Sequence, residues 1–255
     1  MEQEAGAAIV PEPEPVAGKT VLVTGGSTGI GRATARALAS AGARVAIVGR
    51  HERELDDAAE DIRREGGQVL ALRGDLARPE DVRRIFAETD ARLGRLDIVV
   101  SNAALGAGSI VDTPYEEWEY VVRTNLLAYL AVSHEAIERM KSRGGGHLVF
   151  VGSMSADVRE KGSSIYVATK GGIQGFAEAL RKEVNELGIK VSLIEPGAVG
   201  TDMQAQFPPE EQREQIDRMA MLRAEDIAAC VLYVVTQPQR CDVIDVKIRP
   251  HRQEI

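Results

Sequence analysis

The chain has 255 residues, of which 44% are hydrophobic and 27% are charged, and its formal net charge at pH 7 is −8. This acidic balance disfavours broad binding to nucleic acid or to an anionic membrane surface, and no apolar run is long enough to span a bilayer. The two cysteines and four scattered histidines lack the spacing of a metal site, so we expect a reduced, cytoplasmic protein without a metal.

The first segment of the chain is rich in proline and acidic residues. The prolines and glutamates of the stretch VPEPEPVAG predict an extended or disordered acidic leader over residues 1–17. The same segment lacks the basic start and the continuous apolar run of a signal peptide.

From residue 18 onward, short apolar runs alternate with amphipathic helical patterns. Strands without polar alternation, separated by helices, indicate a mostly parallel sheet with helices on both faces. The sequence therefore predicts the α/β class: one doubly wound Rossmann-type domain over 18–255, with ligands at the carboxyl ends of the strands. In chain order the predicted elements are a strand at 20–26, a helix at 31–42, a strand at 43–50, a helix at 52–65, a strand at 68–76, a helix at 78–94, a strand at 96–104, a helix at 115–142, a strand at 146–153, a helix at 167–187 and a strand at 189–197.

The first predicted strand ends in a glycine-rich turn, TGGSTGIG, which opens the first helix. Glycine lets the backbone turn tightly and approach a pyrophosphate, whose negative charge is favoured at a helix N-terminus. Such a turn alone is weak evidence, but at the first strand–helix junction it predicts a dinucleotide site. The residues expected to contact the cofactor there are Gly25, Ser27, Thr28, Gly29, Ile30 and Gly31.

The end of the second strand favours NADP(H) over NAD(H). A carboxylate at this point binds the ribose 2′-hydroxyl, whereas an arginine accommodates a 2′-phosphate. Here the strand ends in VGRH, so Arg50 is the expected phosphate ligand, with Arg32 or His51 as candidate helpers; the alternative is a solvated loop arginine. Around the adenine and its ribose we expect the residues that follow the third and fourth strands, Asp75, Leu76, Asn102 and Ala103.

A tyrosine and a lysine stand four positions apart in the stretch SSIYVATKGG. One helical turn would place Tyr166 and Lys170 on the same face. Taken alone, this pair fits an ordinary solvated helix face as well as it fits a lysine that alters the acidity of a phenol.

Seven short motifs follow one another along the chain: TGGSTGIG, GDL at 74–76, SNAA at 101–104, TN at 124–125, GS at 152–153, YVATK at 166–170 and PGAVGT at 196–201. Taken together and in this order, they resemble the short-chain dehydrogenase/reductase family from about residue 20 to residue 250. The chain departs from the family pattern where SNAA replaces N-N-A-G and where the C-terminal D-G-G motif is missing, which suggests a different C-terminal strand. Its ending, VIDVKIRPHRQEI, is weakly similar to NADP-dependent 3-hydroxy acid and serine dehydrogenases instead.

The resemblance implies a catalytic centre of Asn125, Ser153, Tyr166 and Lys170. Tyr166 would exchange a proton with the substrate oxygen, while Lys170 would lower the pKa of the phenol and bind the nicotinamide ribose. Ser153, with Ser155 as its rival, would donate a hydrogen bond to the same oxygen. Asn125 would hold a water that relays protons from Lys170; the alternative is a buried asparagine at a helix kink.

The resemblance also implies that the segment after the last of these strands closes over the nicotinamide, through Pro196, Gly197, Val199 and Thr201. Beyond it lie apolar residues that would form an adaptable substrate lid or would simply pack between helices, namely Met203, Phe207, Met219 and Met221.

The sequence thus predicts an NADP(H)-dependent oxidoreductase that transfers hydride between a nicotinamide and a small-molecule carbonyl or secondary alcohol. One alternative is a 3-oxoacyl-carrier-protein reductase, although an acidic carrier is a less natural partner for an acidic chain. The other is a non-catalytic NADP-binding regulatory protein, since a fold does not determine a function. Neither nucleic acid nor a membrane is an expected partner, and we expect a homotetramer or homodimer built on the helices at 115–142 and 167–187.

Overall fold

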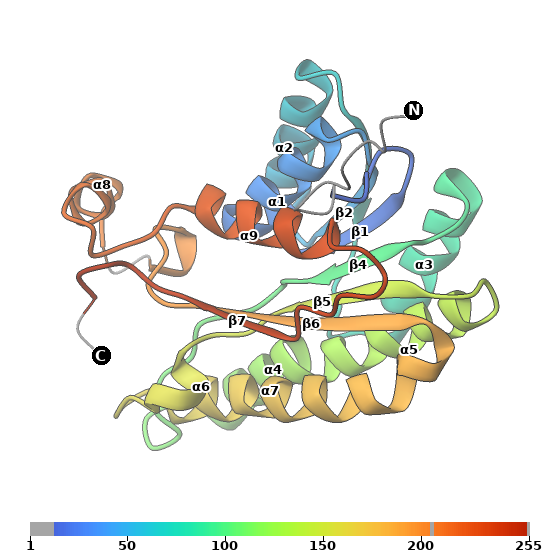
Figure 1. The fold of residues 1–255 in the computed structure, drawn as a ribbon. Coiled ribbons are helices and arrows are strands. Elements are labelled where there is room, and N and C mark those ends of the chain that lie inside the picture. The colour runs from blue at the N-terminus through green and yellow to red at the C-terminus, as the bar shows by residue number, and fades with distance from the viewer. Residues whose placement is uncertain (1–12, 205–206, 254–255) are drawn as a thin grey trace, which may run out of the picture.

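The computed structural model describes residues 13–204 and 207–253. Within them, one sheet contains seven strands in the order β3-β2-β1-β4-β5-β6-β7, and each neighbouring pair is parallel (Figure 1). The predicted Rossmann-type α/β fold is therefore confirmed. The strands are β1 (Thr20–Thr24), β2 (Arg44–Gly49), β3 (Gln68–Arg73), β4 (Ile98–Ser101), β5 (Gly146–Val151), β6 (Ile189–Pro196) and β7 (Asp245–Ile248).

Helices cover both faces of this sheet (Figure 1). On one face lie α1 (Gly29–Ser40), α2 (Glu52–Arg64) and α9 (Ala224–Val235). On the other face lie α3 (Pro79–Leu93), α4 (Tyr115–Val122), α5 (Ala128–Lys141) and α7 (Ser164–Val184). Two short helices, α6 (Ser155–Val158) and α8 (Pro209–Asp217), follow the carboxyl ends of β5 and β6.

The central strands are apolar throughout because both of their faces are buried. In β1, Val21 and Val23 belong to the core beneath α1, α2 and α9, whereas Leu22 between them belongs to the core beneath α3, α5 and α7. All three side chains are fully buried. Successive side chains of a strand point to opposite faces of the sheet. A strand between two helical layers is therefore buried on both faces, and its sequence is apolar throughout.

The helix predicted at 115–142 is interrupted. A π-helical turn, Arg123–Leu127, separates α4 from α5 and contains Asn125. The side chain of Asn125 makes hydrogen bonds with both backbone groups of Leu105. The helix carrying Tyr166 begins slightly earlier than predicted, at Ser164. Strand β7 lies within the C-terminal segment VIDVKIRPHRQEI, where a strand was expected, whereas helix α9 was not delimited by the sequence patterns.

Most of the leader predicted for residues 1–17 lies outside the described residues. Its last five residues are described, and two of them contact the domain. Val16 is only 2% exposed and belongs to the core beneath α9. The backbone N–H of Glu14 donates to the carbonyl of Thr236 at 2.7 Å.

Candidate active site

A cavity of about 1020 Å³ opens at the carboxyl ends of the strands. The predicted catalytic residues Ser153, Tyr166 and Lys170 line it, whereas Gly31 and Asn125 do not. The fold thus brings two motifs that are far apart in the sequence, the glycine-rich turn and YVATK, to the walls of one cavity. The predicted cofactor residues that also line it are Gly25, Ser27, Thr28, Gly29, Ile30, Arg50, Asp75, Leu76, Asn102, Ala103, Pro196, Gly197, Val199 and Thr201.

The glycines of the first turn let it pack against the end of β4. A Cβ atom on Gly31 would lie 2.0 Å from the carbonyl oxygen of Gly25 and 2.6 Å from Nδ2 of Asn102. Gly25 itself has φ +65°, which favours glycine. The amide of Asn102 donates to the carbonyls of Thr24 and Gly25 at 3.0 and 3.2 Å. The turn is therefore a tight backbone cradle beside a helix N-terminus, and it fits a pyrophosphate.

Arg50 follows β2 and lines the cavity. In the sheet, β2 stands three strands away from β5, the strand that precedes Ser153. Its Nη1 donates to the hydroxyl of Tyr120 at 2.8 Å, and that hydroxyl donates to Asp75 at 3.0 Å. The neighbouring carboxylate of Glu52 pairs with Arg73 at 3.4 Å instead. In the described part of the chain no carboxylate lies within ion-pair distance of Arg50. Its charge therefore remains available to an anionic ligand.

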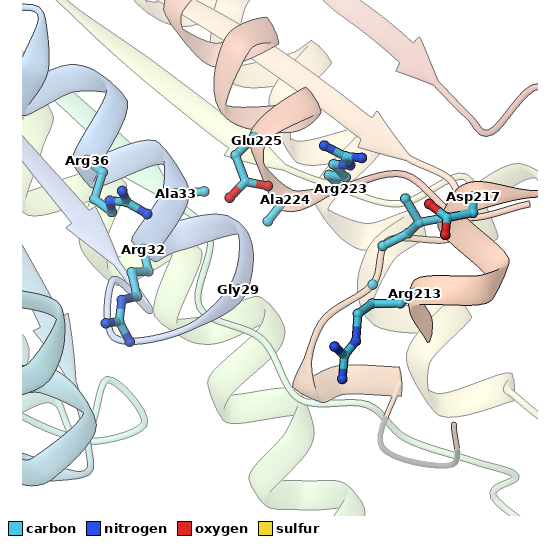
Figure 2. A pocket seen from close by; sticks show the side chains of 11 residues that line it. Gly29, Arg32, Ala33, Arg36, Arg213, Asp217, Arg223, Ala224 and Glu225 are labelled. Atoms are coloured by element: carbon cyan, nitrogen blue, oxygen red, sulfur yellow. The ribbon is translucent and has the colours of Figure 1, made fainter. Parts of the chain in front are cut away.

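Arg32 does not join Arg50, contrary to the expectation that it could help bind a phosphate. Its guanidinium pairs with Asp61 of α2, and Arg32 lines a separate cavity of about 530 Å³ between α1, α8 and the start of α9. Figure 2 shows the side chains of Arg213 and Asp217, from α8, across this cavity from α1. His51, the other candidate helper, lines the larger cavity beside Arg50.

Tyr166 and Lys170 share one face of α7, as their spacing predicts. The ammonium of Lys170 lies 5.6 Å from the centre of the Tyr166 ring and donates to the carbonyl of Val151 at 2.8 Å. The lysine side chain is only 2% exposed. This burial lowers the pKa of Lys170 to about 7, against an opposing influence from the carboxyl group of Glu195.

The acidity of Tyr166 differs from the expectation. Burial raises the pKa of the phenol, and a hydrogen bond with Ser153 offsets this only in part. The expected lowering of the pKa by Lys170 is therefore not seen in the free protein, because desolvation of the phenolate outweighs the other influences. A phenol with a raised pKa is protonated at neutral pH, which suits it to donate a proton.

Of the two candidate serines, Ser153 is the one that faces the tyrosine. The hydroxyl of Ser155 donates to the carboxylate of Glu160 at 3.1 Å. The backbone N–H of Ser155 donates to Oγ of Ser153 at 3.2 Å, which orients the Ser153 hydroxyl. The geometry favours Ser153 for contact with a substrate oxygen.

Asn125 is completely buried beneath the cavity. Its amide donates to the carbonyl of Leu105 at 2.8 Å, its oxygen accepts from the Leu105 N–H at 2.7 Å, and it lies 3.4 Å from Oγ1 of Thr169. These contacts tie the π-helical turn to the loop after β4 and to α7. They match the alternative expectation of a buried asparagine at a helix irregularity, and the water-relay role stays a prediction.

Only one of the four predicted lid residues reaches the site. Sδ of Met203 lies 3.8 Å from the Tyr166 hydroxyl, and Met203 lines the cavity. Met221 is buried elsewhere, at 7% exposure. Phe207 and Met219 are not among the lining residues.

Two further features of the site were not predicted. Tyr120 lacks a sequence signal, because it reaches Arg50 only through the packing of α4. Glu195 directly precedes the PGAVGT motif and is completely buried within β6. Burial raises the pKa of its carboxyl group to about 7. A charged residue inside an otherwise apolar strand was a signal that could have identified it.

Among the described residues, no helix is long and apolar enough to cross a bilayer. In that same part of the chain, histidine, cysteine and acidic side chains do not gather into a group able to hold a metal ion.

Comparison with known proteins identifies the family to which the chain belongs. The family model for short chain dehydrogenases matches residues 19–212. The chain therefore belongs to the short-chain dehydrogenase/reductase family, and it is an oxidoreductase.

Two curated relatives extend over nearly the whole chain. An uncharacterized oxidoreductase of Staphylococcus aureus is 31% identical over 233 residues, which cover 91% of this chain and 97% of the relative. The human 3-oxoacyl-[acyl-carrier-protein] reductase is 35% identical over 221 residues, covering 86% of this chain and 92% of the relative.

Solved structures agree with the fold. A short-chain type dehydrogenase/reductase from Mycobacterium marinum superposes with a TM-score of 0.84 at 28% identity, covering 92% of this chain and 95% of the other. A metagenomic short-chain oxidoreductase in complex with NADP has a TM-score of 0.80 at 26% identity, covering 93% of this chain and 99% of the other.

Proposed function

We propose that this oxidoreductase uses NADP(H) and reduces a small-molecule carbonyl to a secondary alcohol, or catalyses the reverse reaction. The observation that carries the proposal is the layout of the large cavity. Ser153, Tyr166 and Lys170, which form a proton-donating group, line the same cavity as Arg50, which has no carboxylate partner in the described part of the chain.

A nicotinamide cofactor supplies the hydride when it is bound. The residues of this chain would handle the proton. Tyr166, protonated at neutral pH, donates its hydroxyl proton to the substrate oxygen as that oxygen gains negative charge. Ser153 donates a hydrogen bond to the same oxygen. The buried ammonium of Lys170 favours the phenolate left behind, because opposite charges interact strongly where water is excluded.

The preference for NADP(H) over NAD(H) rests on Arg50. A guanidinium presents several N–H donors in a fixed plane, which matches a phosphate. The carboxylate typical of NAD sites at the end of the second strand is absent here, where Gly49 and Arg50 stand instead. The structural neighbour in complex with NADP supports the same choice.

A second candidate function is the reduction of 3-oxoacyl groups on a carrier protein. The observation in its favour is the 35% identity to the human 3-oxoacyl-[acyl-carrier-protein] reductase. A non-catalytic regulatory role is disfavoured, because a protein that only senses NADP has no use for Ser153 and Tyr166 in hydrogen-bonding contact beside a buried lysine.

We also propose that the chain forms a homotetramer or a homodimer. The π-helical turn and α5 expose Leu127 and Leu130, at 50% and 38%, and Tyr115 at the start of α4 is 63% exposed. Apolar side chains gathered on neighbouring helical turns are typical of surfaces that pack against another subunit.

The reaction is tested by NADPH oxidation, followed at 340 nm, against a panel of carbonyl compounds that includes a 3-oxoacyl thioester. Wild type is compared with Tyr166→Phe, which keeps the ring but removes the proton donor. We expect the variant to lose about 10²- to 10⁴-fold in rate, the usual share of general acid catalysis. Equal rates for the two proteins would refute the role of Tyr166, and absence of any active carbonyl would favour the regulatory alternative.

The cofactor is tested by equilibrium binding of NADPH and NADH to Arg50→Asp. Replacing the cation by a carboxylate should weaken NADPH binding by about 100-fold, because a charged hydrogen-bonded contact is replaced by a repulsive one. Binding of NADH, which lacks the 2′-phosphate, should change little. Equal losses for the two cofactors would contradict the proposed phosphate contact.

A further inference from the structure

Tyr120 joins three segments that are distant in the sequence. Its hydroxyl accepts a hydrogen bond from Arg50, at the end of β2, and donates one to Asp75, after β3. The guanidinium of Arg50 also lies over the Tyr120 ring, 5.8 Å from its centre. Arg50 and Asp75 line the large cavity, whereas Tyr120 does not, so the tyrosine contacts both residues from outside the cavity.

The tyrosine hydroxyl stands between a cation and an anion that would otherwise be free to pair. The Asp75 carboxylate already accepts from the N–H of Ala77 at 3.0 Å, through its other oxygen. A neutral hydroxyl that accepts from Arg50 and donates to Asp75 satisfies one atom of each group and leaves the guanidinium charge uncompensated. A direct Arg50–Asp75 ion pair would cancel the charge that a phosphate needs.

Glu52, the other acidic residue near Arg50, is also engaged elsewhere. Glu52, two residues after Arg50, pairs with Arg73 at 3.4 Å. Nε of Arg73 also donates to the carbonyl of Arg50 at 3.3 Å, which fixes the backbone there. Among the described residues, Arg50 therefore keeps an oriented guanidinium with only Nη1 engaged, and its remaining N–H groups are available to a ligand.

We infer that Tyr120 is a positioning residue that holds Arg50 as an uncompensated phosphate ligand and thereby sets the preference for NADP(H) over NAD(H). The inference rests on the proposed function, since it assigns a second residue to the proposed 2′-phosphate contact. A tyrosine that served only to staple α4 to the sheet would affect stability and would affect both cofactors alike.

The test compares dissociation constants of NADPH and NADH for wild type and Tyr120→Phe, measured by quenching of intrinsic fluorescence. The variant retains the ring over Arg50 and loses only the hydroxyl. NADPH binding should weaken by about tenfold, the effect of one hydrogen bond to a charged group, whereas NADH binding should stay within about twofold. Tyr115→Phe on the same helix is the matched control, because Tyr115 is 63% exposed and distant from Arg50 in its contacts; it should change neither constant.

A second pair of variants separates the inference from the proposed function. In Arg50→Met the preference for NADPH should be lost, and adding Tyr120→Phe to it should have no further effect. If Arg50→Met retains the preference, the proposed phosphate contact fails and the inference fails with it. If Arg50→Met loses the preference but Tyr120→Phe keeps it, or weakens both cofactors equally, the phosphate contact stands and the role of Tyr120 is overturned.

Discussion

A buried lysine lies near each end of the strands, and the two lysines differ in the number of hydrogen bonds that compensate their burial. Lys170, near the carboxyl ends of the strands, is 2% exposed, and Lys190, at the start of β6, is 5% exposed. Lys190 donates to three backbone carbonyls just after α9, those of Gln237, Pro238 and Cys241, at 3.3, 3.3 and 2.6 Å. Lys170 donates to one carbonyl and faces the aromatic rings of Tyr129 and Tyr166.

The difference separates a structural lysine from a functional one. Burial lowers the pKa of both side chains. At Lys190 the ammonium is satisfied by carbonyls of the loop that follows α9, so its burial is compensated by hydrogen bonds. At Lys170 the charge is buried beside an open cavity with few partners, which costs stability. Such a cost is typical of residues retained for function.

The largest expected effect on the free energy of unfolding comes from Lys170→Met. The pKa of Lys170 is about 7 in the folded protein, below its ordinary value of 10.5, so between these pH values the unfolded chain binds the extra proton. Wild-type stability from this group therefore rises with pH between 7 and 10.5. The variant should be more stable than wild type at pH 7, by on the order of 4 kcal/mol, and the gain should vanish by about pH 10.5.

This prediction is checked by urea unfolding of both proteins at pH 7, 8.5 and 10. A variant that is less stable than wild type at pH 7 would mean that Lys170 is a structural residue like Lys190, and the comparison would then fail.

Glu195→Gln should sharpen the comparison, because Glu195 is a buried acid at the same carboxyl ends of the strands. Burial is the main cause of the raised pKa of its carboxyl group, about 7 against an ordinary value of 4.5. The folded protein therefore binds the extra proton, and stability is lost as pH rises from 4.5 to 7. Glutamine resembles the protonated form, so the variant should be more stable at pH 8, by on the order of 3 kcal/mol, with little difference at pH 4.5.

The ammonium of Lys247 lies 3.6 Å from the Glu195 carboxylate and also pairs with the carboxylate of Asp157, which is exposed. Asp157→Asn is therefore the control for Glu195→Gln. Thermal unfolding across this pH range measures both variants. A difference between wild type and Glu195→Gln that does not change with pH would contradict the account.

The smallest expected effect on the free energy of unfolding comes from Lys190→Met. Unlike the two preceding variants, it should be less stable than wild type. Removal of the ammonium takes its hydrogen bonds away from three carbonyls, of which that of Pro238 still accepts from the N–H of Cys241. The loss should destabilise the protein by roughly 2 kcal/mol. Cofactor binding should be unchanged, since Lys190 does not line the cavity. Urea unfolding at pH 7 measures the first expectation, and NADPH titration measures the second. Stability equal to wild type would show that the carbonyls find other partners.

Residues that follow strands were predictable from the sequence because the chain itself places them. A parallel sheet aligns the carboxyl ends of its strands. Once the strands were recognised, Arg50, Asp75 and Ser153 could therefore be placed on the same side of the sheet. The spacing of Tyr166 and Lys170 likewise fixed their shared face on α7. Each of these expectations depends only on local pattern plus sheet topology.

What could not be predicted depends on packing between elements. Asn125 was recognised as a poor helix former, but its bonds to the Leu105 backbone follow from the loop conformation after β4. Tyr120 reaches Arg50 and Asp75 only through the packing of α4, which no local sequence pattern specifies. The raised pKa of Tyr166 results from burial, a property of the assembled site that no local pattern reports.

The two lysines also provide the most direct test of the central claim, that Lys170 and Tyr166 form a catalytic pair. The measurement is the rate of NADPH oxidation with an active carbonyl substrate, per folded molecule, for wild type, Lys170→Met and Lys190→Met. We predict a loss of at least about 100-fold for Lys170→Met, as expected when the partner of a general acid is removed, and a rate within about twofold of wild type for Lys190→Met. Equal losses in the two variants, or full activity in Lys170→Met, would contradict the account.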